Sequence, residues 1–86
     1  MDPQTVILYP LMGEKATGMR EKENKLTFIV DKKATKKDVK EAIESLYKVK
    51  VIKVDAINTL DGRKKVHARL DAKYSAEEIA SHFGVL

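Results

Sequence analysis

The sequence has no cysteine and only two histidines, His67 and His82. The lack of cysteine excludes disulfides, thiolate catalysis and cysteine-ligated zinc, and two histidines far apart in the sequence form no metal motif. The four glycines never cluster, so a phosphate-binding glycine loop is missing as well. We therefore predict neither a metal site nor a cofactor.

Long apolar runs are also missing. No segment approaches the roughly 20 apolar residues of a membrane span, and the N-terminus carries Asp2 and Pro3 instead of a basic and then apolar signal segment. We therefore expect a cytoplasmic protein without a membrane span. The 86 residues are 43% hydrophobic and 35% charged, which predicts one folded domain over 1–86. We also expect no homo-oligomer.

Candidate nucleophiles are few. Ser45 lies inside a predicted helix, Ser75 takes a capping position, and Ser81 stands next to His82 without an orienting acid in view. Nucleophilic catalysis needs a hydroxyl facing a base, and adjacent residues of a helix point in different directions. The sequence therefore predicts a protein that is not an enzyme.

Positive charge is concentrated in two segments. The chain has a net charge of +4 and a pI near 9.3. Residues 32–40 hold five lysines and one acid, and residues 63–69 hold no acid at all. A solvated surface and a surface for a polyanion such as RNA both explain these segments.

Hydrophobic periodicity predicts the order β-α-β-α-β-β-α. We expect strands at 5–9, 25–31, 49–60 and 63–70, and helices at 13–23, 35–48 and from 75 to about 84. Thr35 and Ser75 are predicted N-caps, with Asp38 and Glu78 three residues later. The fold class is therefore α+β, with a four-stranded antiparallel sheet covered by helices.

The last two strands form a hairpin whose register can be predicted. A three-residue loop, 60–62, with Gly62 in the left-handed conformation, makes every core pair apolar. The predicted pairs are Ala56 with Val66, Val54 with Ala68, and Ile52 with Leu70. The opposite face then carries Lys53, Asp55, Ile57, Thr59, Arg63, Lys65, His67 and Arg69. That face is cationic.

Aromatic residues are absent from this basic strand. Folds that stack RNA bases on a sheet need Phe or Tyr there, but residues 62–70 contain neither and Phe28 belongs to an apolar face. The pattern favours contact with the phosphates and sugars of folded RNA.

Motifs along nearly the whole chain resemble a known family. They are Pro10 with Glu14-Lys15-Ala16, then residues 24–30, 34–40 and 46–51, then Asn58-Thr59 and Lys64-Lys65. Their order and spacing are similar to those of the universal large-subunit ribosomal protein family numbered twenty-three, in its short archaeal-type form. The resemblance implies binding of large-subunit ribosomal RNA beside the nascent-chain exit tunnel. It also implies contacts with neighbouring ribosomal proteins and a docking site for signal recognition particle and nascent-chain chaperones.

The chain departs from this family at three places. Gly13 replaces a Ser or Thr cap, His67 replaces an aromatic residue, and the link between Thr59 and Lys64 is short. His67 is then either a stacking residue or a cross-strand partner of Asp55. The short link should not enter the tunnel.

The candidate site residues follow from the charge pattern and the resemblance together. The expected RNA-binding residues are Lys15, Lys32, Lys33, Lys36, Lys37, Asn58, Thr59, Arg63, Lys64, Lys65, His67 and Arg69. Lys64 falls on the core side by alternation and would reach out only near the turn. Glu14 matches the acid that the family presents to docking partners.

Two other functions remain open at this point. A small basic nucleoid protein would use the same face on DNA without base contacts. A protein-binding adaptor would use the Met12 and Met19 stripe as a groove, although a stripe that faces the core also explains it.

Overall fold

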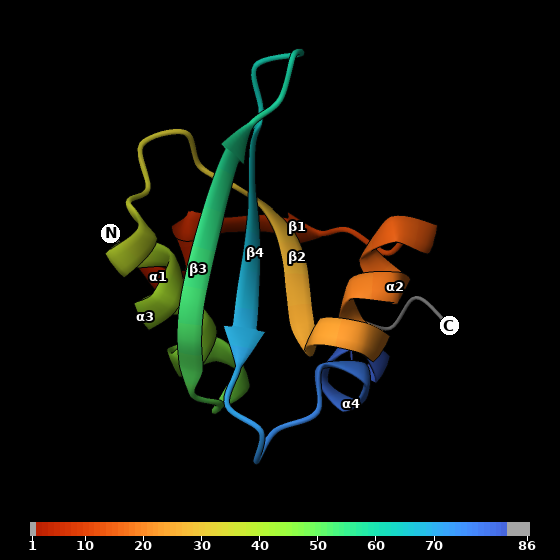
Figure 1. Ribbon diagram of the computed structural model, residues 1–86. Helices are drawn as coiled ribbons and strands as arrows, with labels where there is room; N and C mark the ends of the chain where they lie inside the picture. The colour runs from red at the N-terminus through yellow and green to blue at the C-terminus, as the bar shows by residue number, and fades with distance from the viewer. Residues whose placement is uncertain (1, 83–86) are drawn as a thin grey trace.

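The computed structural model describes residues 2–82 and contains helices on a four-stranded sheet (Figure 1). The elements are α1 (Pro3–Val6), β1 (Ile7–Pro10), α2 (Glu14–Glu23), β2 (Lys25–Val30), α3 (Lys36–Tyr47), β3 (Val51–Asn58), β4 (Lys64–Leu70) and α4 (Ala76–Ser81). The strand order is β1-β2-β4-β3, and all neighbours are antiparallel. The predicted α+β class is confirmed. No helix of the described residues has the length and apolar character that crossing a membrane requires.

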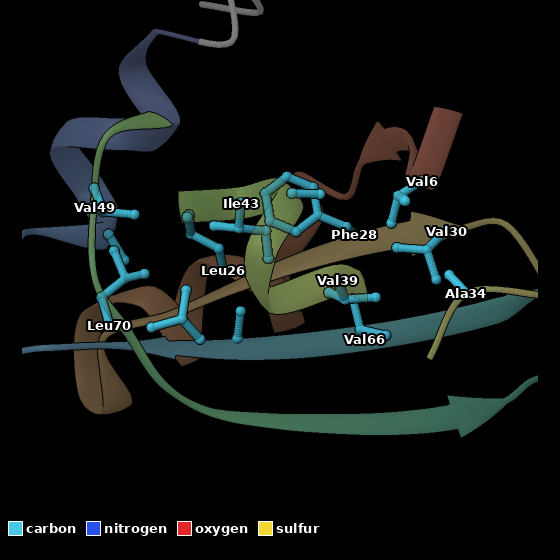
Figure 2. Close-up of a cluster of buried hydrophobic side chains, with 14 of the residues drawn as sticks. Val6, Leu26, Phe28, Val30, Ala34, Val39, Ile43, Val49, Val66 and Leu70 are labelled. Carbon is cyan, nitrogen blue, oxygen red and sulfur yellow. The ribbon is translucent and has the colours of Figure 1, made fainter. Parts of the chain in front are cut away.

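The core lies between one face of the sheet and α3 (Figure 2). Its largest side chains are Leu26, Phe28 and Val30 of β2, Val66 and Leu70 of β4, and Val39 and Ile43 of α3. Phe28 also stacks on Tyr47 with ring centroids 5.9 Å apart. Of the apolar residues at helical spacing in α3, Val39, Ala42 and Ile43 are buried and Tyr47 is partly buried, but Leu46 is 39% exposed.

The first predicted strand begins too early. Thr5 and Val6 belong to α1, and the strand starts at Ile7. Asp2 caps this short helix, because its side chain accepts a hydrogen bond from the Gln4 amide, and Pro3 takes the first helical position. An acid followed by proline is a helix-start signal, so the sequence did contain the information.

The caps of the later helices follow the sequence closely. Thr35 and Asp38 form a complete capping box at α3, with hydrogen bonds of 3.0 and 3.1 Å. At α4 the Ser75 hydroxyl accepts from the Glu78 amide, at 3.2 Å. The predicted end of that helix, from residue 83 to Gly84, lies outside the described residues.

The hairpin register is confirmed over most of its length. Ala56 pairs with Val66 and Val54 with Ala68, and Gly62 has a φ of 86°. The third pair is wrong, because Leu70 faces Val51. A register shift between Val51 and Lys53 turns Ile52 outward, where 54% of its surface is exposed. Such a bulge lets the fully buried Val51 take the core position.

Burial in β2 and α2 extends further than the sequence pattern shows. In β2, Thr27 and Ile29 lie on the face opposite Leu26 and Phe28, yet they are only 5% and 2% exposed. In α2 the buried residues are Ala16 and Arg20. Met12 packs against the core as a partly buried residue, so the stripe does not form an open groove.

Candidate nucleic-acid interface

The face of the sheet opposite α3 carries four of the predicted RNA-binding residues, Arg63, Lys65, His67 and Arg69. The register places three rows across β2, β4 and β3. The rows are Lys25–Arg69–Lys53, Thr27–His67–Asp55 and Ile29–Lys65–Ile57, with Arg63 following at the hairpin end. We call these residues the basic face.

The charges of the basic face are unequally neutralised. Asp55 lies 3.7 Å from Lys25 Nζ and 3.9 Å from Lys53 Nζ, and Lys25 also reaches Glu23, at 3.3 Å. Within residues 2–82, Lys65 and Arg69 form no ion pair with an acid. These two cations can therefore meet an incoming phosphate without first losing a carboxylate.

Arg63 is held by its surroundings. Its guanidinium lies 2.8 Å from Asp61 and donates to the Tyr9 hydroxyl at 2.6 Å. The hydrogen bonds from Arg63 and then from Thr59 lower the pKa of Asp61 to about 2. The hairpin tip therefore carries a fixed pair of opposite charges, and Arg63 has to exchange its partner to bind phosphate.

His67 lies inside the basic face. It is 6% exposed, and its Nδ1 is 2.9 Å from Thr27 Oγ1. Burial, followed by the charges of Lys65 and Lys25, lowers its pKa. The ring bonds to Thr27 instead of Asp55, although Asp55 is its neighbour in the register.

The four lysines between residues 32 and 37 lie in two different parts of the surface. Lys32 and Lys33 line a shallow hollow of about 340 Å³ together with Tyr9 and Arg63. A Cβ at Gly62 would lie 3.5 Å from Lys32 Nζ, so this lysine approaches the hairpin loop. These two lysines extend the basic face at its Arg63 end.

Lys36 and Lys37 lie elsewhere. They line a groove of about 240 Å³ with Lys40, Ile52 and Lys53, between α3 and the edge strand β3. Their charge therefore gathers around the sheet edge, with only Lys53 shared with the basic face.

Three further predicted residues flank the hairpin and behave differently. Lys64 turns to the core side, where its Nζ donates to the Ala34 carbonyl at 2.5 Å. Asn58, its partner in the register, is exposed on the same side. The Thr59 hydroxyl is occupied inside the turn by Asp61 and by the Arg63 backbone.

The beginning of α2 holds the last two predicted residues. Glu14 and Lys15 are both exposed. Lys15 lines a small hollow against Thr27, Lys65 and His67, whereas Glu14 does not line it. Lys15 therefore joins the basic face, and Glu14 lies outside the lining of this hollow.

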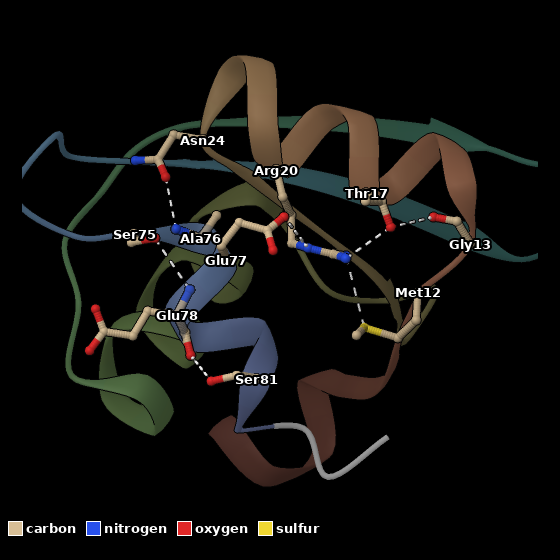
Figure 3. Close-up of polar contacts among 10 residues, drawn as sticks. All are labelled: Met12, Gly13, Thr17, Arg20, Asn24, Ser75, Ala76, Glu77, Glu78 and Ser81. Carbon is tan, nitrogen blue, oxygen red and sulfur yellow. Dashed lines mark hydrogen bonds and ion pairs between the residues drawn. The ribbon is translucent and has the colours of Figure 1, made fainter. Parts of the chain in front are cut away.

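The position of α2 depends on residues that sequence reasoning missed (Figure 3). Arg20 is 9% exposed, and it donates to Thr17 Oγ1 at 2.9 Å and to Glu77 Oε1 at 3.2 Å. Asn24 has a left-handed backbone, donates to the Tyr74 carbonyl and accepts from the Ala76 amide, both at 2.8 Å. These bonds tie α2 to α4.

Lys25 was also missed as part of the interface. Its alternation with Leu26 puts it on the polar side of its strand, but only the pairing of β2 with β4 brings it beside Arg69. Within the part of the chain that is described, no group of His, Asp and Glu side chains could hold a metal ion. The arrangement is that of a cationic surface for binding.

Comparison with known proteins gives a family match and a similar relative. Residues 5–78 match the family model of ribosomal protein L23. The chain is 42% identical over 85 residues to the large ribosomal subunit protein uL23 of Methanococcus aeolicus, with 99% of each chain covered. Proteins of this family are cytoplasmic ribosome components whose partners are ribosomal RNA and other ribosomal proteins. This chain belongs to the ribosomal protein L23 family, and it is a structural component of the large ribosomal subunit, not an enzyme.

Proposed function

We propose that the chain is a single ribosomal RNA-binding domain that holds RNA on its basic face, next to the polypeptide exit tunnel. The observation that carries the proposal is that Lys65 and Arg69, on the central strand β4, have no acidic partner among residues 2–82. Lys25, Lys53 and Arg63 surround them, and Lys15, Lys32 and Lys33 extend the surface. Such an arrangement supplies several phosphate contacts without needing aromatic residues.

Several predicted contacts have smaller roles in this proposal. The amine of Lys64 already donates a hydrogen bond to the Ala34 carbonyl. The Thr59 hydroxyl donates to the Arg63 carbonyl inside the turn. Lys36, Lys37 and Asn58 lie off the basic face and reach only RNA that extends past the sheet edge. The DNA-binding alternative has the same electrostatics but no support from the family match.

The salt dependence of RNA binding tests the basic face. Each phosphate contact that a substitution removes should flatten the slope of log K against log salt by about one unit. We expect the double variant Lys65→Gln and Arg69→Gln to flatten the slope by about two units on large-subunit ribosomal RNA. Lys50→Gln, an exposed lysine before β3, is the matched control. Equal slopes for the double variant and wild type would move the RNA to another surface.

We further propose that Glu14 is the docking residue for signal recognition particle and nascent-chain chaperones. The support is the family resemblance, together with the exposure of Glu14 at the start of α2 and its absence from the lining of the hollow beside Lys15. RNA on the basic face would leave this carboxylate accessible. The short hairpin loop would then remain outside the tunnel.

Ribosomes that carry Glu14→Ala test docking. Losing one exposed charge should change stability by no more than about 0.5 kcal/mol, so incorporation into ribosomes should be normal. Association with signal recognition particle should slow and lose part of its salt dependence. Glu21→Ala, on the same helix, is the matched control. Identical association rates for Glu14→Ala and wild type at two ionic strengths would remove Glu14 from the docking site.

A further inference from the structure

A small hollow lies between the start of α2 and the basic face. Its volume is about 180 Å³, and Leu11, Gly13 and Ala16 form its apolar lining. The buried residues Thr27 and His67, together with Lys15 and Lys65, complete the lining. This volume is well below the roughly 300–1,000 Å³ of pockets for drug-sized ligands. The hollow has space for one flat ring and not for a whole nucleotide.

His67, one of the residues that line the hollow, has one ring nitrogen without a partner. Nδ1 of His67 is occupied by Thr27. Nε2 forms no hydrogen bond within the described residues. Every fully buried side-chain nitrogen or oxygen of these residues does have a hydrogen-bond partner. Nε2 must therefore remain accessible, although 94% of the residue is buried (6% exposed). A neutral imidazole offers Nε2 as one hydrogen-bond donor or acceptor.

The mouth of the hollow is open and positively charged. A Cβ added at Gly13 would meet nothing within 4 Å. Gly13 is the N-cap of the ten-residue helix α2 and supplies no side-chain hydrogen bond to its first amides, which have no partner inside the helix. Together with Lys15 and Lys65, these amides favour an anion at the mouth.

We propose that this hollow receives one unstacked base of the bound RNA, with the adjoining phosphates held by Lys15, Lys65 and the α2 N-terminus. The inference rests on the proposed RNA-binding function and adds a base-reading site to it. The apolar walls replace the stacking that the base loses on leaving its helix. Nε2 of His67 meets one polar atom on the edge of the base. The cationic mouth selects a ligand whose ring is attached to phosphate.

Titration with nucleoside monophosphates tests the hollow in the free protein. The probes are AMP, GMP, CMP and UMP, and the readouts are the NMR signals of the His67 ring and the Ala16 methyl group. We expect at least one nucleotide to shift both signals, while the ring of the exposed His82 serves as the internal reference. The absence of any shift at His67 with all four nucleotides would overturn the proposal.

Two variants that fill the hollow sharpen the test. Gly13→Leu and Ala16→Leu should weaken the nucleotide-induced shifts about tenfold or more, whereas Gly13→Ser should retain them and supply the missing cap. Gly18→Leu, at an open position of the same helix, is the size-matched control. Undiminished shifts in both filled variants would also overturn the proposal.

The test separates this inference from the proposed function. If the double variant at Lys65 and Arg69 flattens the salt slope while nucleotides leave His67 unmoved, the basic face binds RNA and the base site is wrong. If the slope does not change either, the proposed function fails together with it.

Discussion

Arg63 and Asp61 form a two-pronged ion pair at the tip of the β3–β4 hairpin. Nη2 of Arg63 lies 2.8 Å from Asp61 Oδ2, and Nε lies 2.9 Å from the same oxygen. The pair neutralises one cation of the basic face in the free protein. Replacing Asp61 by Asn should therefore steepen the salt dependence of RNA binding by up to about one unit, as measured by titration at several salt concentrations. A slope equal to that of wild type would show that Arg63 does not contact phosphate.

The same pair predicts an unusual titration for Asp61. The folded pKa of about 2 lies below the ordinary value of 3.8, so the stabilisation by the pair is complete above pH 3.8 and is lost as the pH falls towards 2. Carbon-detected NMR of the Asp61 carboxyl should give a midpoint near 2. Arg63→Gln should move that midpoint upward, because it removes the largest cause of the shift. An unchanged midpoint in this variant would show that Arg63 does not stabilise the carboxylate.

His67 makes folding sensitive to mild acid. Its pKa is lowered in the folded state from the ordinary 6.5, first by burial, so the unfolded chain takes up a proton that the folded chain resists. The free energy of unfolding should fall as the pH decreases below about 6.5, as urea titrations between pH 7 and 5 can measure. His67→Phe should flatten this dependence. His82→Gln should preserve it, and loss of the dependence in His82→Gln would contradict the assignment to His67.

Arg20 should contribute to stability and not to RNA binding. Its side chain is 8% exposed and bonds to Thr17 and Glu77. Arg20→Met should reduce the free energy of unfolding by about 1.5–3 kcal/mol, because buried hydrogen bonds to a charged group are lost. Glu77→Gln should cost less than about 1 kcal/mol, since that carboxylate is 49% exposed. A cost for Arg20→Met within about 0.5 kcal/mol of zero would contradict this role.

Two glycines should respond to alanine in opposite directions. Gly62 has a φ of 86°, so Gly62→Ala should destabilise the fold by about 1 kcal/mol through the left-handed backbone. The Lys32 amine, 3.5 Å from the new Cβ, adds no clash. Gly18 lies inside α2 with open space around it, and Gly18→Ala should stabilise by about 0.8–1.0 kcal/mol. Denaturant unfolding of both variants checks the two signs, and a stabilised Gly62→Ala would contradict the turn assignment.

Local signals were sufficient for most of the fold. Alternation and helical spacing located α3 and the β3–β4 hairpin, and the requirement that Ala56 and Val54 face apolar partners gave the correct register. The same requirement failed at Ile52, because a bulge exchanges one residue for its neighbour without changing the pattern of the remaining strand.

The basic face could be predicted only in part. The run from Arg63 to Arg69 showed the charges of β4, and the family resemblance supplied Lys15. Lys25 joins them only through the pairing of β2 with β4. The burial of Arg20 could not be predicted, because a buried arginine and an exposed one give the same local sequence pattern. Its partner Glu77 is also distant in the sequence. Long-range contacts of this kind leave no periodic trace in a sequence.

The strand order has a consequence for the chain as it is being synthesised. β4 is made last of the four strands and lies between β2 and β3. Until residues 64–70 emerge, the strands already made form two separate pieces, a β1–β2 pair and an isolated β3. A polypeptide truncated after Asn58 would therefore lack the inner strand β4 and keep the edge strands β1 and β3. The nascent protein can close its sheet only after residues 64–70 have been made, because Leu26 of β2 pairs with Ala68 of β4.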